Sequence, residues 1–185
     1  MRLRLARIGV FLLLCQVGLA KPADSPGISL DVPFIRQEKD GCGAASIAMV
    51  IQYWALQQGP AIPANSNPKT IQQALYSKEA RGIYASAMIR YFRESGFRTF
   101  VFKGEQKDLK DHLSKGRPLI VSLQPGARGA PLHYVVVAGL DWKQGLVLLN
   151  DPARRKLIPI AQSEFDKEWN AAGNWTLLAV PAQRE

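Results

Sequence analysis

Cysteine, histidine and long hydrophobic runs are all scarce in this chain. Its 185 residues include two cysteines and two histidines. The apolar run Ile8 to Leu14 is too short to cross a membrane, and Gln16 and Lys21 follow it closely. Two cysteines permit one disulfide at most, so a disulfide framework is excluded and no membrane-spanning helix is expected.

Residues 1–20 instead have the pattern of an export signal. Three arginines precede the apolar run: Arg2, Arg4 and Arg7. Small residues up to Ala20 suit a cleavage site. We therefore expect a mature domain of residues 21–185 in a periplasmic or secreted location. Cys15 follows three leucines rather than the small residue that precedes a lipid-attached cysteine, so a lipoprotein is not expected.

Removal of the signal would leave Cys42 as the single thiol and exclude an internal disulfide. A lone thiol in an oxidising compartment favours a chemical role, since it risks oxidation; burial as a small inert side chain is the alternative. About 165 residues would remain, enough for one domain whose core needs neither metal nor disulfide.

The charge is basic but dispersed. The net charge of +9 falls to about +6 without the three signal arginines, and Arg154–Lys156 is the longest basic run. Nucleic-acid binding is therefore not expected. Attraction to anionic envelope surfaces or acidic peptides is compatible with this charge.

The periodicity predicts helices first and strands second, which is an α+β layout. An extended segment, 28–35, precedes the first helix. Helices are predicted from Cys42 to about 58, then over 70–77, 85–95 and 107–115, and in a short segment to Trp169 capped by Ser163. Strands are predicted over 98–103, 119–123, 133–140, 146–149, 156–160 and 175–180. The Pro-rich stretch to Pro68 is predicted to be a loop at the rim of a cleft.

Cys42 at a helix start is the residue best suited to be a nucleophile. Free N–H groups and the positive end of the helix dipole favour the thiolate over the thiol. Gly41 and Gly43 would let the backbone turn sharply around it.

A thiol nucleophile needs a base, and histidine suits that work near neutral pH. His133 begins a strongly apolar strand, where a polar ring requires a buried partner. His112 lies among charged residues and is interpreted as surface. Asp151, at the end of the next strand, is the candidate for orienting the base, and Asn150 is the fallback; alternation allows only one of them to do so. A role in an Asp-Pro turn is the alternative interpretation of Asp151.

Gln37, five residues before Cys42, is the candidate donor to an oxyanion, together with the Cys42 backbone N–H. An exposed loop glutamine is the alternative interpretation of this residue.

Taken together, these residues resemble the papain-like clan, specifically the bacteriocin-processing peptidases that cleave double-glycine leaders and their stand-alone exported relatives. The similar blocks are 31–37, 41–50, 132–139, 150–153 and 163–165 with Trp169. The resemblance implies a papain-like α+β fold with the nucleophile at a helix start, packed on a C-terminal antiparallel sheet. Many members place the glutamine one residue further from the cysteine.

The resemblance implies that Cys42 is the nucleophile, His133 the general base and acid, Asp151 the orienting residue and Gln37 the oxyanion donor. It implies no metal or organic cofactor. The expected partner is a peptide or protein substrate, with an export-system or envelope protein as a further partner. Two other functions stay open: a thiol enzyme acting on cell-wall peptides or acyl acceptors, and a papain-like module that binds peptides without turnover.

Overall fold

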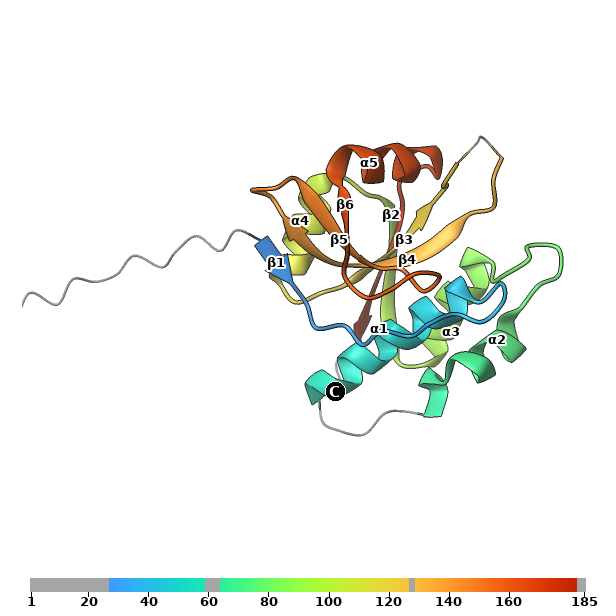
Figure 1. Ribbon diagram of the computed structural model, residues 1–185. Helices are drawn as coiled ribbons and strands as arrows, with labels where there is room; N and C mark the ends of the chain where they lie inside the picture. The colour runs from blue at the N-terminus through green and yellow to red at the C-terminus, as the bar shows by residue number, and fades with distance from the viewer. Residues whose placement is uncertain (1–26, 59–63, 127–128, 183–185) are drawn as a thin grey trace, which may run out of the picture.

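The computed structural model describes residues 27–58, 64–126 and 129–182 (Figure 1). The predicted signal, 1–20, and part of the predicted Pro-rich loop lie outside the described residues. No described helix is both long and apolar enough to span a bilayer.

Three helices precede the main sheet strands and two are interleaved with them. They are α1 (Cys42–Gln58), α2 (Pro68–Leu75), α3 (Ala85–Glu94), α4 (Gln106–Ser114) and α5 (Gln162–Ala171), with a short 3₁₀ helix η1 (Ala64–Ser66) before α2. Helix α2 begins two residues earlier than predicted because the Asn67 side chain caps it, accepting from the N–H groups of Lys69 and Thr70. Ser163 is not a cap, contrary to prediction: α5 has Ala161 at that position and no side-chain cap.

The described strands form one antiparallel sheet. They are β1 (Gly27–Ser29), β2 (Phe97–Lys103), β3 (Leu119–Leu123), β4 (His133–Asp141), β5 (Leu146–Asn150), β6 (Ile158–Ala161) and β7 (Trp175–Pro181). Their order is β2-β7-β3-β4-β5-β6, and β1 pairs with the end of β4. The predicted extended segment 28–35 is therefore a strand only at its start, and the rest leads into α1.

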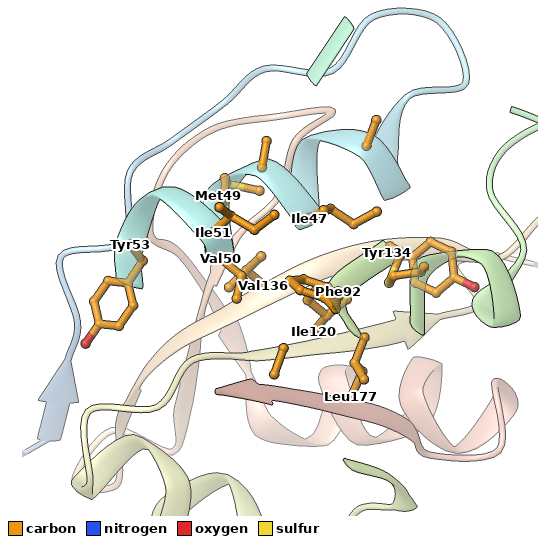
Figure 2. Close-up of a cluster of buried hydrophobic side chains, with 14 of the residues drawn as sticks. Ile47, Met49, Val50, Ile51, Tyr53, Phe92, Ile120, Tyr134, Val136 and Leu177 are labelled. Atoms are coloured by element: carbon orange, nitrogen blue, oxygen red, sulfur yellow. The ribbon is translucent and has the colours of Figure 1, made fainter. Parts of the chain in front are cut away.

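The sheet separates two apolar clusters. Helices α1, α2 and α3 pack on one face, while α4 and α5 pack on the other (Figure 1). Figure 2 shows side chains of α1 and Phe92 of α3 gathered over Ile120, Val136 and Leu177 of the sheet. Helices first and an antiparallel sheet second confirm the predicted α+β class.

Helix α1 is buried over most of its circumference. Every residue from Gly43 to Ile51 is buried. Trp54 is partly buried and its indole N–H donates to the Ala179 carbonyl at 3.0 Å. A helix that is apolar on most of its surface packs within the core, and Cys42 is the residue that begins it.

Candidate active site

Cys42 is the first residue of α1, and close packing shapes the turn that presents it. Positive φ occurs at Asp40 (56°) rather than at the two glycines beside Cys42. A Cβ on Gly41 would lie 3.0 Å from the Glu38 carbonyl oxygen, and one on Gly43 would lie 3.1 Å from Cβ of Ile83. The chain does turn sharply just before Cys42, where the Gly41 N–H donates to the Glu38 carbonyl at 3.0 Å, and the two glycines permit close approach of neighbouring atoms.

The thiol of Cys42 lies in a setting that favours its ionised form. Burial alone would raise its pKa, but hydrogen bonds from His133 and from the backbone N–H of Tyr134, and the positive charge on His133, lower it overall. The N–H of Gly43 adds a smaller effect of the same sign. The sulfur is thus stabilised as a thiolate at the start of a buried helix.

The imidazole of His133 links the thiol to a carboxylate. Its Nε2 lies 2.7 Å from Oδ1 of Asp151, so Nδ1 is the nitrogen left for the sulfur of Cys42. The exposed fractions of the two side chains are 19% for His133 and 9% for Asp151. Burial alone would lower the pKa of His133, but its hydrogen bonds to Asp151 and Cys42 raise it to about 9. The ring is therefore an imidazolium at neutral pH.

Asp151 is held as an acceptor for that ring. Burial opposes its ionisation, but the bonds from His133 and from the Ala153 backbone N–H lower its pKa overall. The latter bond is 2.9 Å long. Arg154 lowers the pKa further through its charge.

Asn150 has a separate set of partners, which distinguishes it from its neighbour. It is fully buried, its Nδ2 donates to the Val32 carbonyl at 3.0 Å, and its Oδ1 accepts from the Leu157 backbone N–H at 2.9 Å. Both ends of the amide are engaged away from His133. Of the two alternatives left by the sequence, the structure brings Asp151 to the histidine.

Strand pairing explains how residues 18 positions apart meet. His133 begins β4, and Asp151 directly follows β5. Val136 of β4 pairs with Asn150 of β5, and the register between the two strands shifts between Val137 and Gly139. That irregularity adds one residue to β4 and shifts which of its residues lies opposite the end of β5.

Gln37 lies in a segment bound to the loop that follows β5. Its backbone N–H donates to the Pro152 carbonyl at 3.0 Å, and Arg36 Nη2 donates to the Arg154 carbonyl at 3.0 Å. The side-chain Oε1 of Gln37 is buried and has no hydrogen-bond partner among the described residues. Gln37 is therefore a partly buried residue rather than the exposed loop glutamine of the alternative interpretation.

His112 lies elsewhere, on α4 at the opposite face of the sheet. Its ring is 5.9 Å from that of Phe102, and its Nδ1 is buried without a hydrogen-bond partner among the described residues. Burial and the nearby charges of Arg117 and Lys115 lower its pKa. The interpretation as plain surface is wrong in this respect, since the ring is partly buried.

Tyr134 is a contributor that the sequence did not single out. Its N–H reaches the Cys42 sulfur, while its carbonyl accepts from Ser46 Oγ at 3.3 Å. Its ring packs on Trp175, and burial, with the nearby Cys42 charge, raises its pKa to about 12. Backbone groups leave no residue-type pattern, so only its position next to His133 could have indicated this role.

The arrangement brings together a thiol of lowered pKa, an imidazolium and a buried carboxylate, a set of groups that can carry out thiol-dependent acyl transfer. The sequence profile described as "Peptidase_C39 like family" matches residues 29–177. The chain therefore belongs to this family, and it is a cysteine peptidase of papain-like fold.

Solved structures share the fold. A protein described as a C39-like peptidase from Bacillus anthracis is 16% identical, with a TM-score of 0.66 over 85% of this chain and 99% of that one. The peptidase domain of Streptococcus ComA, a bi-functional ABC transporter involved in quorum sensing, is 21% identical, with a TM-score of 0.61 over 81% and 98%.

A double glycine motif protease from an AMS/PCAT transporter, solved with its leader peptide, is 25% identical, with a TM-score of 0.63 over 83% and 94% of the two chains. No curated protein sequence matches the chain.

Proposed function

We propose that this chain is an exported cysteine peptidase that cleaves peptide or protein substrates through Cys42, His133 and Asp151. The observation that carries the proposal is the continuous chain of contacts from the Cys42 sulfur through the His133 ring to the Asp151 carboxylate at 2.7 Å. Those contacts hold an ion pair whose charges suit attack on a carbonyl and protonation of an amine.

In the first half of the reaction, the thiolate sulfur bonds to the substrate carbonyl carbon, and the C=O π electrons move to oxygen. Collapse of this intermediate breaks the C–N bond, and the amine leaves with the proton of His133. In the second half, His133 takes a proton from water as that water attacks the thioester. The acid product departs, and the thiolate–imidazolium pair is restored.

The proposed oxyanion donors are the Gln37 side chain and the Cys42 backbone N–H. The first turn of α1 supplies the N–H, and the bond from Gln37 N–H to Pro152 holds the glutamine segment against the loop that carries Asp151. Donors fixed before the charge develops lower the barrier without a cost of reorganisation.

A peptide substrate is supported by the leader peptide bound to the AMS/PCAT protease of the same fold. The signal-like residues 1–20 support a periplasmic or secreted location. A protein of the export system or the envelope is the proposed partner that presents the substrate.

The test combines thiol alkylation against pH with a peptide-library digest read by mass spectrometry. We expect Cys42 to react with an apparent pKa well below that of a free thiol, about 8.5, and this shift to disappear in His133→Ala. We also expect Cys42→Ala to abolish cleavage. A thiol with an unshifted pKa, or cleavage that survives Cys42→Ala, contradicts the proposal.

Two results would identify the other functions. A shifted thiol with no cleavage in the peptide library but with activity on isolated wall peptides indicates the cell-wall enzyme. Peptide binding by an unreactive thiol indicates the non-catalytic module.

A further inference from the structure

Strand β2 ends the sheet with an open edge. Among the described residues its one strand partner is β7. It is seven residues long and contains no proline, whereas β6 at the opposite end has four residues including Pro159. Short strands, prolines and charged side chains are the usual protection of a sheet edge; β2 is neither short nor interrupted by proline, and its two cations, Arg98 and Lys103, lie towards its ends.

The hydrogen bonds at both ends of β2 determine which backbone groups face outward. Ala182 N–H donates to the Gly96 carbonyl, and Gly104 N–H donates to the Asn174 carbonyl, each at 2.9 Å. Hydrogen-bonded pairs alternate along an antiparallel ladder, so even-numbered residues between these ends bond to β7. The outward N–H and C=O groups therefore belong to the odd-numbered residues: Phe97, Thr99, Val101 and Lys103.

Apolar side chains are exposed on both faces of this edge. Phe100 is 44% exposed and Val101 is 45% exposed, and neighbouring residues of a strand point to opposite faces. Phe102, on the face of Phe100, packs into the cluster under α4 and α5, whereas Phe97 packs into the cluster under α1 and α3. The centre of the edge is thus apolar and its ends are anchored.

We propose that a second copy of this chain pairs with β2, edge to edge and antiparallel, with Phe100 on the two-fold axis. In this register Thr99 lies opposite Val101 of the copy and Phe97 opposite Lys103. All seven residues are paired, and the outward-bonding odd-numbered residues meet one another, as an antiparallel ladder requires.

The charges of the strand favour this register. Arg98 faces Phe102 of the copy and Lys103 faces Phe97, so no two cations are opposed. Arg98 already lies over an aromatic ring within its own chain, 5.5 Å from the centroid of Phe100. A one-residue shift in either direction would bring bonding residues against non-bonding ones, and in one direction it would also oppose Arg98 to Lys103. The strand is therefore complementary to itself.

Cross-linking tests the register directly. A Phe100→Cys variant in a Cys15→Ala, Cys42→Ala background places two thiols in a non-hydrogen-bonded pair, where Cα atoms lie about 4.5 Å apart and a disulfide fits. We expect mild oxidation to yield a disulfide-linked dimer. The matched control is Arg98→Cys, because its two copies would be four residues out of register, about 13 Å apart. Equal cross-linking by both variants would overturn the proposal.

Sedimentation at rising concentration tests association without introduced thiols. The pairing is smaller than a standard interface, so we expect the weight-average mass to rise above that of a monomer only at high concentration. Phe100→Asp sets two carboxylates on the axis and should remain monomeric, while Leu56→Asp, at a similarly exposed apolar position, should associate normally. Circular dichroism checks that both variants fold. A wild-type chain that stays monomeric at every concentration refutes the proposal, including the case in which another protein's strand occupies the edge.

Discussion

The backbone N–H of Gln37 donates to the carbonyl of Pro152 at 3.0 Å. This single bond joins the segment that enters α1 to the loop that carries Asp151. Asn150 strengthens the junction through Val32, and Lys156 forms an ion pair with Asp31 at its far end. The proposed oxyanion donor and the proposed orienting carboxylate are thus positioned by one set of contacts.

Because Asn150 contributes to these contacts, Asn150→Ala should lower both the stability of the fold and the rate of catalysis. The substitution leaves the Val32 carbonyl and the Leu157 N–H unpaired in the interior, so the free energy of unfolding should fall by about 3 kcal/mol. We also expect kcat to fall more than KM rises, because two reacting groups lose alignment. Denaturant unfolding and steady-state kinetics measure the two effects.

The exposed Asn170 of α5 provides the control, and Asn170→Ala should change neither quantity. If Asn150→Ala lost stability while kcat was unchanged, Asn150 would hold the fold without positioning the site.

Asp151→Asn should reduce kcat/KM by about 10²-fold and narrow its pH profile. The bond to Asp151 is the largest of the effects that raise the pKa of His133, and burial acts in the opposite direction. Without the carboxylate, the alkaline limb should move from about 9 to lower pH. The measurement is kcat/KM against pH. The matched control is Asp111→Asn, on the exposed side of α4, which should leave the pH profile as in the wild type. An unmoved alkaline limb would mean that the carboxylate does not control the ring.

Gln37→Ala should reduce kcat/KM by about 10²-fold through loss of one oxyanion donor. The alkylation rate of Cys42 against pH should stay as in the wild type, because none of the groups that shift the pKa of this thiol is Gln37. A reduced rate of cleavage together with a shifted thiol pKa would show that the substitution disturbs the ion pair, which is a different role.

Stability against pH should depend on whether both members of the ion pair are present. The pKa of His133 rises on folding from 6.5 to about 9, so its contribution is full below about 6.5 and is lost as pH rises through about 9. The pKa of Cys42 falls from 9.0, so its contribution is present above 9.0 and is lost as pH falls through the lowered value.

Above 6.5 and above the lowered pKa of Cys42, and below about 9, the folded pair and the unfolded pair each bind one proton, so their effects on the slope cancel. The wild-type unfolding free energy should therefore vary little with pH from this source. In Cys42→Ala, His133 retains the bond to Asp151 but loses the raising effect of Cys42, so stability should decline as pH rises from about 6.5 through the remaining raised pKa, which lies below about 9. Denaturant unfolding across this range compares the two chains, and parallel profiles would contradict the thiolate–imidazolium pair.

Local sequence determined the elements that carry the site. A buried helix starting at Cys42, an apolar strand starting at His133 and an Asp-Pro turn after the next strand were all predictable, because periodicity and turn chemistry act between near neighbours. The α+β class followed from the order of those elements.

The tertiary structure decided which neighbours meet. The choice of Asp151 over Asn150 depends on a one-residue irregularity in β4, and the tight packing at Gly43 depends on Ile83, forty residues away. The contact of the Tyr134 N–H with Cys42 and the outward-facing residues of β2 depend on strand register. Strand register is set by contacts between segments that are distant in the sequence, so it could not be predicted from composition and spacing. These groups come together only in the folded chain.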